Sequence, residues 1–573
     1  MLSNSFSRGV LPSVTTQYIA PNQLTDLRAT DSARVTLIDG GHGPSSQDGS
    51  ERLPVSHAPA LLMLTIFSLL LFVVGNETDQ VGLASWGVLT LFAGVFLWCS
   101  ASWRTRYVAL AFVAVFGVFL LGRLIVLLVF RSPQDSAAGS DPSCLGLICS
   151  SSSQFMLTLT CLYVSILGVV LGAFSMEVLP ARSKKRLVPS SQVSQHRLRT
   201  LRTSMGLLLT LSALCHLLDL VLAARYVFDH GYLTYYLQAY YSPLPSIVTI
   251  PGAMLPAAFP AYMLARPTRR AGQYAIAIYL AVSAVSLFTY QRSEFILALC
   301  VVAVFVISRR ASTVGPARRV RFSLALVLIP TGLLLLNGML WISRTRLLGG
   351  TTTQRAGLTG FLDEQGASLN VVALAIDYRT SLPQGRNYLL GPLFEKAFGL
   401  WMSLLRHPNP FAGQSVERAL EGQNLAHILS YLYMPNVYLS GGGLGSSFVA
   451  ELFVTAGVPG VFLGSLVLGV VLAFLPRLIH RTYLTGVLAL LIVRSLLWAP
   501  RGSYLGVIID LVNPSTLFVL ALCSLSLIQS NATRPRDFMK ATRHLPPRLA
   551  SARLPCVDGT GIGAGTLPTT RSH

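Results

Sequence analysis

Long apolar runs constrain the fold of this chain more than any other feature of its sequence. Each run approaches the roughly 20 residues that an α-helix needs to cross a bilayer. The runs are continuous and do not alternate with a period of two, so they indicate helices and not the strands of a barrel. We therefore expect an all-α, polytopic membrane helix bundle with about twelve transmembrane helices. The runs cover residues 58–75, 81–100, 107–130, 154–176, 204–225, 246–265, 272–289, 293–308, 321–342, 445–476, 482–499 and 504–528.

The composition agrees with a membrane protein. Of the residues, 52% are hydrophobic and only 12% are charged, whereas a soluble domain carries roughly 25% charged residues. The formal net charge of +21 would also suit a nucleic-acid-binding protein. Here, however, the positive charge is divided among short segments between the apolar runs, as signals for membrane insertion are. We therefore expect a lipid bilayer around this chain and no nucleic-acid partner.

Basic segments alternate with neutral or acidic ones along the chain. The basic segments are 101–106, 177–202, 266–270, 309–321 and 477–481. Because Lys and Arg collect on the cytoplasmic side of a membrane, both termini are expected in the cytoplasm. The expected organisation is a disordered N-terminal tail (1–56), transmembrane helices 1–9 (57–342), a large extracytoplasmic loop (343–444), transmembrane helices 10–12 (445–528) and a basic C-terminal tail (529–573).

The large loop breaks the positive-inside rule, because it faces outward and is rich in arginine. Its arginines are Arg344, Arg346, Arg355, Arg379, Arg386, Arg406 and Arg418. An outward loop of this kind indicates an anionic ligand, and phosphate is the group that arginine forks hold best. Two stretches of the loop, 368–378 and 389–405, have apolar positions at helical spacing. We expect short helices on or in the outer leaflet, which form either a structural cap or a cover over a lipid-linked substrate.

Cysteine and motif spacing exclude several classes of site. Cys144 and Cys149 fall in an outward loop, where they are either a disulfide or two free thiols, since spacing alone does not fix the geometry. The chain has no zinc-type cysteine spacing, no metalloprotease motif and no P-loop. We therefore expect no metal and no cofactor.

A glycine-rich segment, 440–447, precedes the apolar run at 445–476. Gly443, Gly445 and Ser446 allow a tight backbone path, and Ser446 or the next serine can cap the following helix, whose exposed N–H groups favour an anion. Glu451 lies within that apolar run, and an acid at membrane depth is costly and therefore a functional candidate. The alternative is an ordinary kink with Glu451 paired to an arginine. The sequence Gly-Val-Pro-Gly at 457–460 predicts a break that separates a half-helix from a full span.

Further charged residues lie within or beside the apolar runs. Arg494 and Arg501 are seven residues apart and would lie near one face if the helix continued, although Pro500 is expected to end or bend the helix there. The deeper Arg494 needs a partner, for which Glu451 is one choice. Arg292 reaches the outer face, where a local pair with Glu294 is the simpler interpretation. His216 and Asp219 share a face as either a structural hydrogen bond or a proton relay.

The loop also holds two histidines, His407 and His427. A neutral imidazole can accept a proton from an attacking hydroxyl near pH 7. Each is either such a base or an ordinary surface residue, so His427 is a second candidate base beside Glu451.

The glycine-rich segment resembles a pattern of the O-antigen polymerase (Wzy-type) family of bacterial membrane proteins. That pattern is G-x-G-L-G-x-S-x-x-A-E followed by a small-residue turn, and here it covers residues 441–451 and 457–460. The resemblance extends by motif over about 290–510 and by architecture over the whole chain, with a GT-C-like fold implied. Weaker similarities are Gln291-Arg292-Ser293-Glu294, Ser368-Leu369-Asn370, Leu382-Pro383, Gly385-Arg386, Tyr388 and Pro500-Arg501-Gly502-Ser503.

The resemblance implies a metal-independent polymerising glycosyltransferase at the outer face of the bacterial cytoplasmic (inner) membrane. Its donor would be a glycan on undecaprenyl pyrophosphate, and its acceptor a lipid-linked repeat unit. A chain-length-regulating membrane protein and a repeat-unit flippase are further candidate partners. We hypothesise that the catalytic residues are Glu451, as the base or as the residue that orients an arginine, His427, as the alternative base, and Arg501. The substrate-binding candidates are Arg292, Arg344, Arg346, Arg386, Arg494, Gly443, Gly445 and Ser446. The product is O-antigen, capsule or exopolysaccharide.

Two other functions stay open at this point. An O-antigen-ligase-like glycan transferase would share the architecture and the lipid donor but use a different acceptor. A non-enzymatic polysaccharide transporter or flippase would expose polar residues through the whole depth of the bundle and often show repeated halves. The polar residues of this chain collect towards the outer face and no clear repeat is visible, which favours an enzyme.

Overall fold

The computed structural model describes residues 58–130, 151–178, 195–230, 242–289, 292–311 and 357–532, except positions 406, 408 and 412. Every regular element in these ranges is a helix, and they contain no strand. The predicted helical class is therefore confirmed for the described part of the chain. The run at 321–342 and both cysteines of the 144–149 pair lie outside these ranges, as do both chain ends.

The N-terminal helices are α1 (Ala58–Glu77), α2 (Val81–Ala101), α3 (Trp103–Phe116), the π-helix η2 (Gly117–Leu121), α4 (Gly122–Val129) and α5 (Ser152–Val178). Glycine permits close packing between α1 and α2. A Cβ added at Gly75 would lie 2.4 Å from the backbone nitrogen of Ala84. Near the N-terminus of α3, Arg106 forms an ion pair with Glu177 of α5 at 2.6 Å, and its guanidinium lies over the Trp98 ring.

The middle helices are α6 (Gln195–His230), α8 (Ser246–Ala253), α9 (Leu255–Leu264), α10 (Arg269–Val285), the 3-10 helix η5 (Ser286–Thr289) and α11 (Arg292–Ala311). The pair α8 and α9 is bent by 48°. Pro251 and Pro260 lie within these two helices, and proline removes a helical hydrogen bond and clashes with the preceding turn.

The predicted large loop contains α13 (Gly357–Gln365), α14 (Ser368–Asp377), α15 (Gly391–Leu404), α16 (Val416–Glu421), α17 (Leu425–Tyr433) and α18 (Pro435–Leu439). The two short helices expected here are present as α14 and α15. However, α14 does not lie on a leaflet, because every residue from Ser368 to Ile376 is buried and the helix packs between α5 and α19. In contrast, Phe394, Leu400 and Trp401 of α15 are exposed, as expected of a helix at a membrane surface.

The C-terminal helices are α19 (Phe448–Ile479), α20 (Tyr483–Trp498), the 3-10 helix η7 (Ala499–Arg501), α21 (Gly506–Leu511) and α22 (Pro514–Ala532). The break predicted near residue 457 is confirmed: Ala456 and Gly457 have non-helical backbone angles, and Gly457 has φ +63°. The run at 504–528 is divided between the short helix α21 and α22.

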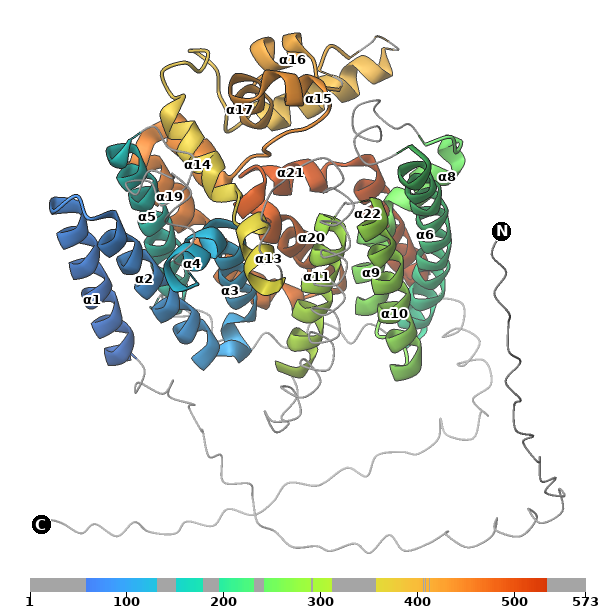
Figure 1. Ribbon diagram of the computed structural model, residues 1–573. Helices are drawn as coiled ribbons and strands as arrows, with labels where there is room; N and C mark the ends of the chain where they lie inside the picture. The colour runs from blue at the N-terminus through green and yellow to red at the C-terminus, as the bar shows by residue number, and fades with distance from the viewer. Residues whose placement is uncertain are drawn as a thin grey trace, which may run out of the picture. The chain divides into compact units, whose positions relative to one another are not determined.

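Small residues bring α19 and α5 into close contact. A Cβ added at Gly172 would lie 2.0 Å from the carbonyl oxygen of Leu466, and one at Gly469 would lie 2.1 Å from that of Val169. Small residues let helix backbones approach in this way inside a membrane bundle. Figure 1 shows α5 and α19 side by side, next to α14.

Seven described helices are long and apolar enough to cross a membrane, or eight if the bent pair α8 and α9 forms one span. The shorter apolar segments Leu61–Glu77 and Pro514–Ile528 are further helices of the same character. The chain is therefore a polytopic helix bundle, while the total of twelve spans and the division into tails, spans and outer loop stay predictions.

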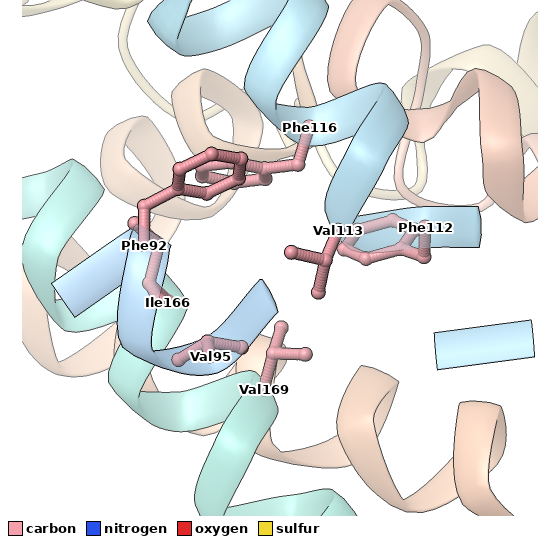
Figure 2. A pocket seen from close by; sticks show the side chains of 7 residues that line it. All are labelled: Phe92, Val95, Phe112, Val113, Phe116, Ile166 and Val169. Atoms are coloured by element: carbon pink, nitrogen blue, oxygen red, sulfur yellow. The ribbon is translucent and has the colours of Figure 1, made fainter. Parts of the chain in front are cut away.

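A small apolar cavity lies among α2, α3 and α5. Figure 2 shows its lining, which consists of Phe92, Val95, Phe112, Val113, Phe116, Ile166 and Val169. These side chains have no polar atoms, so the cavity offers nothing to orient a polar substrate. The chemistry has to be sought among the polar side chains near the start of α19.

Candidate functional site

Near the start of α19, the side chain of Glu451 forms hydrogen bonds with two segments that are distant in the sequence, the glycine-rich segment and residues 503–504. Its side chain is 0% exposed. One carboxylate oxygen accepts a hydrogen bond from the Ser446 hydroxyl at 2.7 Å, and the other accepts one from the backbone N–H of Tyr504 at 2.8 Å. The Ser503 hydroxyl adds a further hydrogen bond. Hydrogen bonds to both oxygens offset part of the cost of burying this carboxyl group, and they fix the glycine-rich segment against residues 503–504.

The glycine-rich segment runs beside Arg501. Gly445 has φ +82°, a left-handed conformation that favours glycine. A Cβ added there would lie 3.7 Å from the carbonyl oxygen of Arg501. The segment and η7 are therefore neighbours, although they are far apart in the sequence.

Ser447 occupies the N-cap position of α19, as the sequence predicts, but the cap hydrogen bond is absent. Its hydroxyl is buried and has no hydrogen-bond partner among the described residues. The Ser446 hydroxyl, the other predicted cap, donates to Glu451 instead. The capping prediction is thus right about the position and wrong about the contact.

Arg501 is positioned by three elements. Its guanidinium donates to the Gln365 side chain at 3.1 Å, which comes from the end of α13. It also lies 5.8 Å from the ring centre of Phe119 in η2 and 5.9 Å from that of Trp498. Aromatic faces attract a guanidinium and limit its rotation, so this charge is held in a defined place.

His427 lies on α17 and faces Tyr438, with 3.1 Å between its Nδ1 atom and the tyrosine hydroxyl. Burial, and to a smaller extent the nearby charge of Arg418, lowers the pKa of this imidazole to about 4. Arg418 itself pairs with the buried Glu395 at 3.4 Å. His427 is therefore neutral at ordinary pH. His407, the other loop histidine, is exposed.

Hydrogen bonds connect α17 to the glycine-rich segment. The Ser430 hydroxyl accepts from the backbone N–H of Leu444 at 3.0 Å, and the Gln414 side chain donates to the carbonyl of Gly442 at 3.2 Å. A continuous path of contacts therefore leads from the loop helices through residues 442–446 to Glu451. Arg386, a predicted phosphate ligand, lies on the loop side, where it donates to the carbonyl oxygen of Gly422.

Arg494 does not join this group. It hydrogen-bonds Tyr279 of α10 and interacts electrostatically with Glu294 of α11, and within the described ranges no ion pair connects it to Glu451. Glu294 in turn pairs with His216 at 3.4 Å. The predicted contacts of Arg494 with Glu451 and of His216 with Asp219 are therefore replaced by others.

Some predicted site residues cannot be placed. Arg344 and Arg346 lie outside the described residues, and the Arg292 side chain does too, although its backbone begins α11. Conversely, sequence reasoning missed Gln365, Ser430 and the backbone N–H of Tyr504, none of which belongs to a motif with a recognisable spacing. Among the side chains that are described, no group of three or more His, Cys, Asp or Glu could hold a metal ion.

Comparisons with curated proteins and with solved structures found no match. A protein-family model described as O-antigen polysaccharide polymerase Wzy matches residues 60–530, which include all of the site residues placed above. Since the match covers most of the chain, this protein belongs to the O-antigen polysaccharide polymerase Wzy family and is a multi-pass bacterial membrane protein that polymerises glycan repeat units as a glycosyltransferase.

Proposed function

We propose that this protein transfers a growing glycan from undecaprenyl pyrophosphate to a lipid-linked repeat unit at the outer face of the inner membrane. The observation that carries the proposal is the path of contacts from α17 through the glycine-rich segment to Glu451, which ends beside Arg501. The backbone of Arg501 lies beside Gly445, and its guanidinium is oriented by Gln365, Phe119 and Trp498. This supports a site that combines a positive charge with open backbone, both of which suit a pyrophosphate leaving group.

Arg501 is proposed to stabilise the pyrophosphate as the glycosidic C–O bond breaks. Its planar fork can bind two phosphate oxygens at once. Arg386 on the loop side is the second described candidate, and Arg292, Arg344 and Arg346 remain candidates by sequence. No metal is needed in this proposal, because arginine supplies the positive charge.

Glu451 is proposed to position the site, since donors already occupy both of its oxygens. Gly443, Gly445 and Ser446 would offer a close backbone approach to the phosphate. The acceptor is deprotonated by a separate base. With a pKa of about 4, His427 is neutral near pH 7, but such a low pKa makes it a weak base, because a general base works best with a pKa near the operating pH.

The pKa of His427 leads to a prediction about pH dependence. Because its pKa is lowered to about 4, the imidazole gains no proton between pH 8 and pH 5. The ratio of the elongation rates of wild-type protein and the His427→Gln variant is therefore expected to stay constant over this range, measured with purified protein and lipid-linked repeat units. If the ratio changes with a midpoint near pH 6.5, the pKa of His427 is not lowered and the prediction is wrong.

The proposed topology places both termini in the cytoplasm and α13–α18 outside, in a GT-C-like arrangement. The exposed aromatic and aliphatic side chains of α15 would then contact the outer leaflet. A repeat-unit flippase would supply the substrate from the cytoplasm, and a chain-length-regulating membrane protein would limit the product.

The function is tested in a strain from which the gene for this protein has been deleted. Its lipid-linked and surface polysaccharides are separated by gel electrophoresis and their chain lengths compared with those of the wild type. We expect single repeat units at the surface and no ladder of longer products. Long lipid-linked glycans that fail to reach the surface would indicate a ligase, and repeat units trapped at the cytoplasmic face would indicate a flippase. Either of these outcomes contradicts the proposed polymerase.

A further inference from the structure

Four helices contribute a second polar site, which we call the α6–α20 cluster. It consists of His216 in α6, Tyr279 in α10, Glu294 in α11 and Arg494 in α20, joined by the contacts described above. Three of these residues lie in helices that are candidate membrane spans. Ionisable groups at such depth are costly, so their presence points to function.

Arg494 of the cluster and Asp219, a neighbour of His216 on α6, each have one polar atom without a hydrogen-bond partner among the described residues. The Nε atom of Arg494 is buried with no hydrogen-bond partner in the described part of the chain, and so is one carboxylate oxygen of Asp219, one turn from His216. Leaving such groups unpaired away from water costs free energy. A group bound at Arg494 has to accept a hydrogen bond, and a group bound at Asp219 has to donate one. A sugar hydroxyl does both, whereas a phosphate oxygen only accepts.

His216 and Glu294 are arranged as a base and the residue that orients it. The Nε2 atom of His216 lies 3.4 Å from a Glu294 oxygen, so the carboxylate favours the tautomer with the proton on Nε2 and leaves the Nδ1 lone pair available. Both side chains are partly exposed, His216 to 18% and Glu294 to 35%. Glu451, by comparison, is fully buried.

The position of the cluster suits a role beside Arg501. Arg494 precedes Arg501 by seven residues, and the end of α20 at Trp498 and the 3-10 helix η7 lie between them. The bent span α8–α9 also packs tightly on His216, because a Cβ added at Gly252 would lie 3.2 Å from the His216 backbone nitrogen. The backbone that carries His216 is therefore closely packed, and the cluster is connected through Arg494 to the helix that leads to Arg501.

We propose that the α6–α20 cluster binds the acceptor sugar and that His216 is the general base, an inference that rests on the proposed polymerase function. The acceptor O–H loses its proton to Nδ1 of His216. The oxygen forms a bond to the anomeric carbon of the donor, whose bond to the pyrophosphate oxygen breaks with its electron pair on the leaving group. Glu294 is a positioning residue that holds the imidazole and stabilises its charge, while Asp219 and Arg494 bind hydroxyl groups.

The test measures the first transfer, in which two repeat units become a dimer. Full-length protein in lipid nanodiscs is given lipid-linked repeat units isolated from the deletion strain. His216→Gln is expected to lower kcat about 100-fold or more, the usual contribution of a general base, with KM little changed. Glu294→Gln is expected to lower kcat by a smaller factor, also with little change in KM, and Asp219→Asn to raise KM for the repeat unit while kcat changes less.

His230→Gln is the matched control, because His230 is an exposed histidine of the same helix and should leave both constants unchanged. Thermal unfolding of each variant separates a catalytic effect from a structural one. If folded His216→Gln protein keeps the wild-type kcat, the cluster is only a polar contact between helices and the inference is wrong. If wild-type protein forms no dimer at all, it is the polymerase function that fails.

Discussion

Replacing Arg501 by alanine is expected to abolish the ladder of long glycans while the protein remains in the membrane at its normal level. Loss of one preorganised donor to developing negative charge slows a reaction by about 100-fold to 1,000-fold. A polymer needs many successive transfers, so this factor removes long products first. The measurement is a gel of surface polysaccharide together with an immunoblot of the membrane fraction.

Arg501→Lys separates charge from geometry. Lysine keeps the positive charge but not the planar fork, so we expect short products if two phosphate oxygens are bound at once. The matched control is Arg225→Ala, because Arg225 is 79% exposed and pairs only along its own helix with Asp229. Ladders of normal length from Arg501→Ala would refute the role of this residue in binding pyrophosphate.

The sequence alone predicts the features of the fold that depend on local chemistry. The apolar runs predict where helices form, as for residues 81–100 and α2 at Val81–Ala101, because twenty apolar residues must satisfy their own backbone in a bilayer. The sequence Gly-Val-Pro-Gly likewise predicts the break at Ala456 and Gly457. These features depend on local chemistry, which a single sequence contains.

Partners across helices depend on how each helix is rotated, and no local pattern records that. Arg494 was expected near Glu451, yet it contacts Tyr279 on a helix more than 200 residues earlier in the chain. The burial of α14 is an intermediate case. Its sequence SLNVVALAID is apolar on nearly all sides, which is the pattern of a buried helix and not of one with a single membrane-facing side.

The candidate site shows the same division. Glu451 and the glycine-rich segment stand out in the sequence, because a lone acid in an apolar run is unusual. Its partners do not, since one is the backbone N–H of Tyr504, a group that every residue except proline carries. The role of Glu451 therefore has to be decided by experiment.

Two substitutions of Glu451 distinguish a positioning residue from a base. Glu451→Ala removes the acceptor of the donors of Ser446, Ser503 and Tyr504. Ser446 is buried, and one buried donor left unpaired costs about 1–3 kcal/mol. We therefore expect a destabilisation of this order, seen as a lower midpoint of thermal unfolding, together with loss of the glycan ladder.

Glu451→Gln is expected to behave differently. The amide oxygen can accept from the N–H of Tyr504, and the Ser446 hydroxyl can rotate to accept from the amide nitrogen, so the fold and most of the ladder should persist. The control is Glu77→Gln, a change at an exposed acid. An inactive Glu451→Gln protein with wild-type thermal stability would mean that the carboxylate itself takes the proton, because only a base requires the charge that the amide lacks.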